Sequence, residues 1–169
     1  VIIEGNINNG YQPTLSMLKN SSLDLKGLII ASPANPTGSI IDNLEMLKIS
    51  KWCGKNNIKM ISDEIYHGIE YENRSNTVLS YDRKAIVVNS FSKYFSMTGW
   101  RLGFAVLPTE QEAEHFTNFN INIISCTPPF SQVAGVEAYI NEKTNAEVLH
   151  MVKNFEERRN YATPALNAI

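Results

Sequence analysis

The sequence of 169 residues has few cysteines, no long apolar run and no excess of basic residues. Cys53 and Cys126 lie far apart and form no C-x-x-C pair, which argues against a disulfide framework or a zinc site. No apolar run approaches the ~18 residues of a membrane span. Lys and Arg total 15 against 17 for Asp and Glu, so the basic excess of a nucleic-acid binder is missing. We therefore expect no metal, membrane or nucleic acid as partners, and a reducing cytoplasm as the location.

The composition is that of one globular domain. Hydrophobic residues make up 43% and charged residues 19% of the chain, which argues against a disordered or fibrous protein. The chain opens on Val1 without a signal-like segment, and it stops at Ile169 inside a helical pattern. We expect an internal fragment of a longer protein.

Short apolar runs alternate with helical patterns along the chain. The runs have the length of strands, and they lie at 28–30, 58–62, 85–89 and 103–107. The helical patterns lie at 44–56, 109–121, 129–141 and 144–161. Asp42 is the predicted N-cap of the first of these helices, with Glu45 as its capping-box partner. This alternation predicts βαβ units and an α/β fold with a mainly parallel sheet.

Polar residues follow three of the predicted strands. Asn35, Asp63 and Lys93 each come just after a separate apolar run, and ligands bind at the carboxyl ends of strands in such sheets. Lys93 is the most informative of the three. A lysine near cationic or apolar groups loses its proton readily and can then form a Schiff base. A solvated surface lysine is the plain alternative, and the residues around Lys93 argue against it.

Residues 90–103 resemble the pyridoxal-phosphate attachment signature of the class I and II aminotransferases, which are fold-type I enzymes; they read Ser-Phe-Ser-Lys-Tyr-Phe-Ser-Met-Thr-Gly-Trp-Arg-Leu-Gly. The Asn-Pro-Thr-Gly turn at 35–38 and the Asp-Glu-Ile-Tyr element at 63–66 resemble two further motifs, in the family's order. Within the family the chain is most similar to the bacterial aspartate and aromatic type. The resemblance implies a three-layer α/β/α arrangement, with 1–143 as a portion of the cofactor-binding large domain. Residues 144–169 would begin the long helix toward a small domain.

The resemblance implies that the cofactor is pyridoxal 5′-phosphate (PLP). Lys93 would hold PLP as a Schiff base and act as the general base that moves the substrate's α-proton. Asp63 would keep the ring nitrogen of PLP protonated, and Asn35 and Tyr66 would hydrogen-bond its phenolic oxygen. Lys93, Asp63 and Tyr66 are therefore the predicted catalytic residues.

The cofactor's phosphate would be bound by residues of the same attachment run. Arg101 offers a planar fork of donors for a dianion, and the Ser90 hydroxyl adds a further donor. Ser92 is predicted either to reach the phosphate or to pack beside it. Outside this set, His67 is expected to be structural, and Cys53 is expected to be a small packing residue in a helix.

The resemblance implies an aminotransferase that moves an amino group from an L-amino acid to a 2-oxo acid in a ping-pong scheme. Two alternatives stay open: another fold-type I enzyme such as a C–S β-lyase, and a non-enzymatic PLP-binding regulatory domain. The intact parent is expected to be a homodimer, and the 169 residues alone are expected to be inactive. Arg158 and Arg159 are candidates for ion pairs with acidic groups on a neighbouring element.

Overall fold

The computed structural model describes residues 2–21 and 24–169. Its strands are β1 (Gly27–Ala31), β2 (Lys59–Asp63), β3 (Ile86–Ser90) and β4 (Gly103–Val106). Its α-helices are α1 (Leu15–Asn20), α2 (Asn43–Lys55), α3 (Glu110–Ile124), α4 (Pro129–Ile140) and α5 (Glu142–Asn167). Short 3-10 helices lie at η1 (Ile7–Asn9), η2 (Val78–Ser80) and η3 (Thr98–Trp100).

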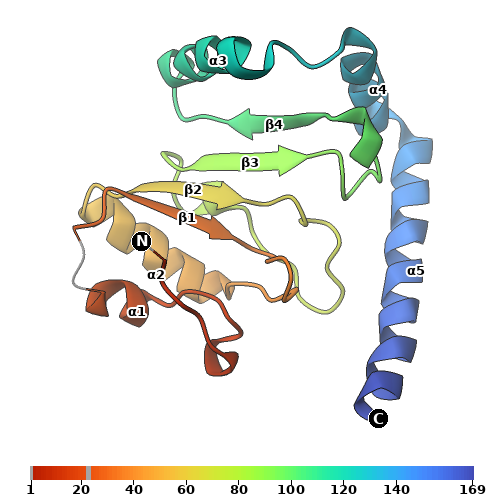
Figure 1. Ribbon diagram of the computed structural model, residues 1–169, viewed down its shortest axis with the longest axis horizontal. Helices are drawn as coiled ribbons and strands as arrows, with labels where there is room; N and C mark the ends of the chain where they lie inside the picture. The colour runs from red at the N-terminus through yellow and green to blue at the C-terminus, as the bar shows by residue number, and fades with distance from the viewer. Residues whose placement is uncertain (1, 22–23) are drawn as a thin grey trace.

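The four strands form one sheet in the order β1-β2-β3-β4 (Figure 1). β1, β2 and β3 are parallel, and β4 pairs antiparallel with β3. A parallel neighbour needs a crossover connection, which α2 provides between β1 and β2. Residues 91–102 instead fold into a turn and η3, so the chain returns beside β3 in the opposite direction. The predicted α/β class with a mainly parallel sheet is confirmed.

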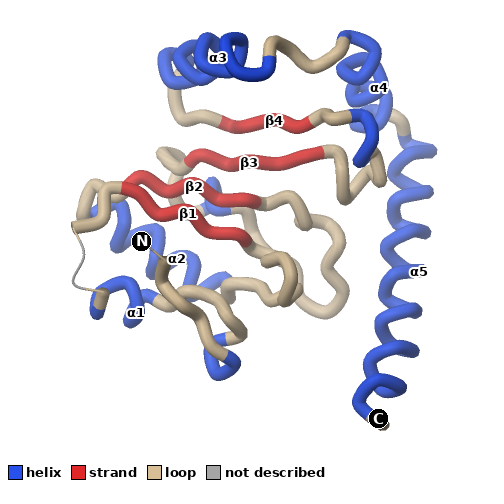
Figure 2. The backbone as a smooth tube through the Cα atoms, in the orientation of Figure 1, coloured by secondary structure: helices blue, strands red, loops and turns tan. Residues whose placement is uncertain are grey.

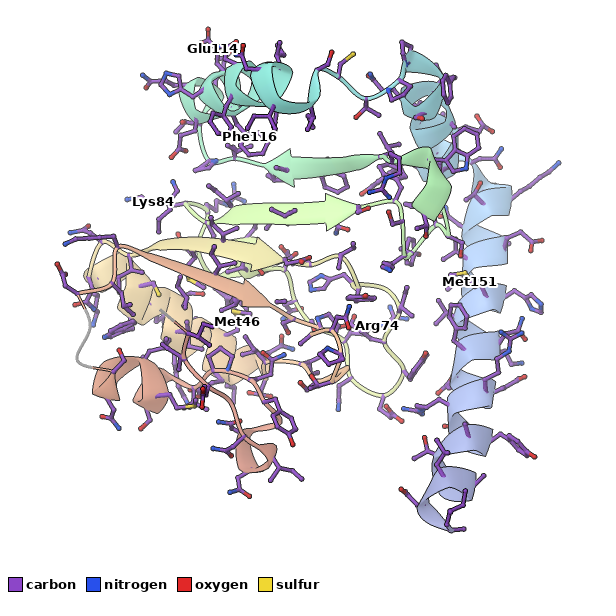
Figure 3. The ribbon with its side chains drawn as sticks, viewed as in Figure 1. Met46, Arg74, Lys84, Glu114, Phe116 and Met151 are labelled. Atoms are coloured by element: carbon purple, nitrogen blue, oxygen red, sulfur yellow. The ribbon has the colours of Figure 1, made fainter. Side chains whose placement is uncertain are left out.

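The core lies between the sheet and α2. Strand residues alternate between two faces, so Ile30, Met60 and Val87 point to the side covered by α2. Ile49 of α2 is fully buried against them, and Met46 joins it from the same helix (Figure 3). Each of these side chains contributes about 1.5–3 kcal/mol by leaving water. This packing fixes the three parallel strands, β1, β2 and β3, whose ends carry site residues.

The start of α2 differs in part from its prediction. Asp42 caps the helix as expected, because its Oδ1 accepts hydrogen bonds from the backbone N–H of Leu44 (2.8 Å) and Glu45 (3.4 Å). Glu45 does not complete a capping box with Asp42: its Oε1 accepts from the backbone N–H of Leu15 at 2.7 Å. Leu15 is the first residue of α1, where N–H groups lack partners within the helix. A carboxylate from another helix satisfies that donor.

α3, α4 and α5 lie beside β4 and the carboxyl ends of the parallel strands (Figure 1). Phe116 lies on the side of α3 that faces β4, and Glu114 lies on the opposite side (Figure 3). Glu112, in the first turn of α3, forms an ion pair with Lys59 at the start of β2. Figure 2 shows α5 as a long helix that runs past the loops beyond β1, β2 and β3. It begins at Glu142, slightly earlier than the predicted residue 144.

Candidate functional site

The candidate site lies where three parallel strands end. β1, β2 and β3 point to the same edge of the sheet (Figure 1). The turn at 32–38 follows β1, the turn at 63–68 includes the last residue of β2, and the run at 90–101 includes the last residue of β3. The sheet therefore brings the three predicted motifs to one edge, which is where open α/β sheets bind ligands.

The turn that carries Asn35 is held from inside the fold. The backbone N–H of Ala34 donates to the carbonyl of Ser39 at 2.9 Å, which closes the turn. The buried Gln12 side chain donates its amide to the carbonyl oxygens of Ser39 (2.7 Å) and Ala31 (3.2 Å). These bonds fix both ends of the turn and leave the Asn35 side chain exposed at its tip.

The turn after β2 carries Asp63 and Tyr66. Oδ1 of Asp63 accepts a hydrogen bond from the backbone N–H of Ile65 at 3.1 Å, which orients the carboxylate. Gly68 has a φ of +85°, and a Cβ at this position would lie 2.4 Å from Cε2 of Tyr94. A residue without a side chain is therefore needed where this turn packs against the residue after Lys93.

Lys93 is half-buried in the turn after β3. Its Nζ lies 5.7 Å from the centre of the Tyr66 ring, so the structure brings these two predicted residues together. The turn is fixed by aromatic packing: the Phe91 and Phe95 rings stack with centroids 5.1 Å apart, and Tyr139 of α4 meets Phe91 edge-on at 5.8 Å.

A hollow of about 210 Å³ lies beside this turn; it is lined by Ser90, Ser92, Arg101, Leu102 and Gly103. The Ser90 hydroxyl accepts from the backbone N–H of Ser92 at 3.0 Å, and the two hydroxyl oxygens lie 2.9 Å apart. Arg101 is exposed, and its Nη1 donates to the carbonyl of Thr98 at 2.8 Å. Two hydroxyls and a guanidinium, with no acidic side chain in the lining, form a donor set suited to a phosphate dianion.

A second hollow, of about 580 Å³, lies between the turns that follow β1 and β2; it is lined by 33–40, Tyr66, 69–73 and Arg159. Asn35 and Tyr66 thus share one hollow, while Ser90, Ser92 and Arg101 share the other. Asp63 and Lys93 line neither hollow. Arg159 of α5 pairs with Glu72, which also lines this hollow, so one of the two candidate arginines forms an ion pair with a neighbouring element.

Sequence reasoning missed one buried group of this region, Glu64. Its side chain is 4% exposed, and it faces the His67 imidazole with Oε2 at 3.5 Å from Nδ1. A signal was present, because adjacent residues at a strand end point to opposite faces and Asp63 was assigned to the ligand side. The alternation therefore sends Glu64 toward the interior, where a carboxylate needs partners.

Other reactive groups lie outside this region. Burial raises the pKa of the Cys53 thiol to about 11, and the residue packs in the core as predicted. Over residues 2–21 and 24–169, no three or more His, Cys, Asp or Glu side chains gather as possible metal ligands. Within the same residues, every helix is too short or too polar to cross a membrane.

The family described as aminotransferase class I and II matches residues 5–169. The chain belongs to this family. It is 44% identical over 139 residues to the valine–pyruvate aminotransferase of Mycobacterium tuberculosis, a match that covers 79% of the chain and 35% of that protein. It is 38% identical to an aspartate aminotransferase of Bacillus sp. strain YM-2, covering 100% of the chain and 44% of that protein.

Solved structures of aminotransferases share the fold. The aromatic aminotransferase of Pyrococcus horikoshii OT3 superposes with a TM-score of 0.93 at 31% identity, over 99% of this chain and 46% of that one. The fold-type I architecture expected from the resemblance is therefore confirmed. The chain spans less than half the length of each of these aminotransferase relatives.

Proposed function

We propose that this chain provides the PLP-holding part of an aminotransferase that moves an amino group from an L-amino acid to a 2-oxo acid. The observation that supports the proposal best is the convergence of three family motifs at one sheet edge, with Lys93 beside Tyr66. Family membership and the names of the relatives support the same reaction class. The activity is proposed for the whole protein.

The residues at this edge fit PLP by their chemistry. Ser90, Ser92 and Arg101 would bind its phosphate in the hollow of about 210 Å³, which contains no acidic lining residue. Asn35 and Tyr66, which share the other hollow, would donate hydrogen bonds to the phenolic oxygen of the ring. When bound, PLP supplies an electron sink for the electron pair left by the substrate's α-proton.

Asp63 and Lys93 carry the proposed charge and proton chemistry. Asp63 would place a carboxylate at the ring nitrogen of the cofactor, which favours the protonated form of that nitrogen. Lys93 Nζ would bind the cofactor's aldehyde group covalently as a Schiff base. In each half of a ping-pong scheme, the free Nζ of Lys93 would be the base that takes up the substrate's α-proton and the acid that gives it back.

Several features of the whole protein belong to this proposal. Residues 1–143 would be the cofactor-binding portion of a large domain, and 144–169 would lead toward a second domain. A homodimer is supported by large exposed apolar side chains on α3 and α4, which include Phe119, Ile124, Phe130 and Val133. A cytoplasmic location is supported by the two free cysteines, because a reducing compartment keeps thiols unpaired.

Product analysis tests the proposed reaction. The whole protein, of which this chain is a part, is incubated with PLP, an L-amino acid and a 2-oxo acid, and transfer is expected to yield a new 2-oxo acid and a new amino acid in equal amounts. Lys93→Ala is expected to lower the rate by about 10³-fold or more. Release of pyruvate, ammonia and a thiol from a cystathionine-like substrate would instead show β-elimination. Bound PLP without turnover of any amino acid would contradict the proposal.

A further inference from the structure

A buried carboxylate and an imidazole connect the turn of Tyr66 to the turn of Asn35. Glu64 is almost fully buried, and its Oε1 accepts a hydrogen bond from the backbone N–H of Val78 at 2.8 Å. Its Oε2 faces Nδ1 of His67 at 3.5 Å. The other ring nitrogen of His67, Nε2, lies 3.0 Å from the backbone carbonyl oxygen of Ser32. The contacts therefore run from the end of β2 to the start of the turn after β1.

The chemistry of these partners determines the orientation of the His67 ring. A carbonyl oxygen can only accept a hydrogen bond, so the ring hydrogen that faces Ser32 lies on Nε2. Nδ1 faces Oε2 of Glu64 at 3.5 Å, and because a carboxylate oxygen also only accepts, this contact is attractive when Nδ1 carries a hydrogen as well. The Glu64 carboxylate is itself fixed by the backbone N–H of Val78. Because both ring nitrogens have a defined partner, the imidazole is held in one orientation.

Ser32 is the residue at which the chain leaves β1 for the turn of Asn35. Its backbone N–H donates to the carbonyl of Asp63 at 3.1 Å, and its hydroxyl accepts from the backbone N–H of Ile41 at 2.9 Å. The bond from His67 adds a third restraint, on the carbonyl that precedes the turn. Since His67 directly follows Tyr66 in the chain, this bond links the backbone beside Tyr66 to the backbone that leads to Asn35.

We propose that His67, oriented by Glu64, is a positioning residue that holds Asn35 and Tyr66 at a fixed separation across their shared hollow. The inference rests on the proposed function, because these two side chains are the ones assigned to the phenolic oxygen of PLP. Glu64 and His67 act through Asn35 and Tyr66, not through contact with the cofactor. If both donors are held in place, they stabilise the oxygen as an anion and lower the pH at which the cofactor's imine loses its proton.

The test compares four His variants of the protein. His67→Phe keeps a ring but removes the donor to Ser32, and His67→Asn is too short to reach that carbonyl. His67→Gln restores an amide N–H close to the position of Nε2. His115→Phe makes the same ring replacement at an exposed site on α3 and serves as the control. Two readouts are used: the ring ¹⁵N resonances of His67 without cofactor, and the pH midpoint of the visible absorption band with PLP.

The proposal predicts a hydrogen on Nε2 of His67 in the protein without cofactor. It also predicts that the pH midpoint rises by about one unit in His67→Phe and His67→Asn. His67→Gln and His115→Phe are expected to stay within a few tenths of a unit of the wild type. A merely structural histidine would alter stability in urea without moving the midpoint. If His67→Phe does not fold, the pair His67→Asn and His67→Gln, which differ by one methylene, decides the question.

Two results would overturn the inference alone: unchanged midpoints in all folded His67 variants, or a wild-type ring with its hydrogen on Nδ1 only. Both leave the proposed function in place, because the wild type still shows the visible band with PLP. A wild-type protein that develops no band overturns the proposed function and this inference with it. The presence or absence of the wild-type band thus separates the two failures.

Discussion

Arg159 on α5 contacts the Glu72 carboxylate with both terminal nitrogens of its guanidinium. Nη1 lies 3.0 Å from Oε2, and Nη2 lies 2.6 Å from Oε1. The same guanidinium lies over the Tyr71 ring, 4.6 Å from its centre. A planar fork that binds a carboxylate in two places and stacks on an aromatic ring is specific to arginine. The contact joins α5 to the loop after β2, at the wall of the hollow that contains Asn35 and Tyr66.

We predict that Arg159→Lys loosens the last turns of α5, because lysine cannot form the two-point contact. Hydrogen exchange should show several-fold lower protection of the amides around 155–163, and Arg158→Lys on the same helix is the control. The hydrogen bond from Arg159 lowers the pKa of Glu72. Because folding lowers this pKa, the contact is fully formed at pH values above the ordinary pKa of a glutamate. It is lost as the pH falls through the lowered pKa. Equal protection in both variants would contradict the prediction.

Glu45 is predicted to stabilise the junction of α1 and α2 in a pH-dependent way. Its hydrogen bond from the Leu15 backbone lowers the pKa of Glu45. The stabilisation is therefore complete near neutral pH and disappears as the pH falls through the lowered value. Glu45→Gln should reduce the free energy of unfolding in urea by about 1 kcal/mol near neutral pH, and the two proteins should converge in acid. Glu114→Gln, on an exposed position of α3, should leave the free energy unchanged.

The two thiols are predicted to react at very different rates. Burial raises the pKa of Cys53 to about 11, so its reactive thiolate is scarce at neutral pH. Cys126 is exposed. A thiol reagent should label Cys126 at once in the folded protein, while Cys53 should be labelled only after unfolding in denaturant. Rapid labelling of both thiols in the wild type, and of the one remaining thiol in Cys126→Ala, would show that Cys53 is not buried.

The packing of Gly68 against Tyr94 predicts an unusually harmful glycine substitution. Gly68→Ala would place a Cβ 2.4 Å from Cε2 of Tyr94 at a φ of +85°, so either the ring or the turn must move. We expect a loss of about 1–3 kcal/mol in the free energy of unfolding and weaker PLP binding, because Tyr94 adjoins Lys93. Gly54→Ala in α2 meets no atom within 4 Å and should stabilise the protein by about 0.5–1 kcal/mol. Similar effects of the two substitutions in thermal unfolding would contradict this account.

The sequence predicted where the helices and strands lie better than it predicted the contacts between them. The strands and the Asp42 cap depend on apolar runs and turn residues that lie close together in the chain, so local patterns suffice for them. Glu45 was assigned to the cap of its own helix because its true partner, Leu15, belongs to another helix. The direction of β4 was also not predicted, since it depends on how 91–102 fold back.

In the candidate site, too, local motifs could be predicted from the sequence, but contacts between distant residues could not. Each motif was visible in the sequence, and the parallel strands explain why their turns meet. The bond from His67 to Ser32 connects residues that no local pattern relates, because it depends on the register of β1 and β2. Arg158 and Arg159 were both candidates for ion pairs, and only the path of α5 shows that Arg159 pairs with Glu72.

The central claim is that Lys93 is the residue that holds PLP, and a covalent label tests it most directly. The protein is mixed with PLP, reduced with borohydride and digested, and the labelled peptide is identified by mass spectrometry. The account predicts one cofactor adduct on Lys93, together with loss of the visible absorption band in Lys93→Ala. A label on another lysine such as Lys84, or an equal band in Lys93→Ala and the wild type, would contradict it.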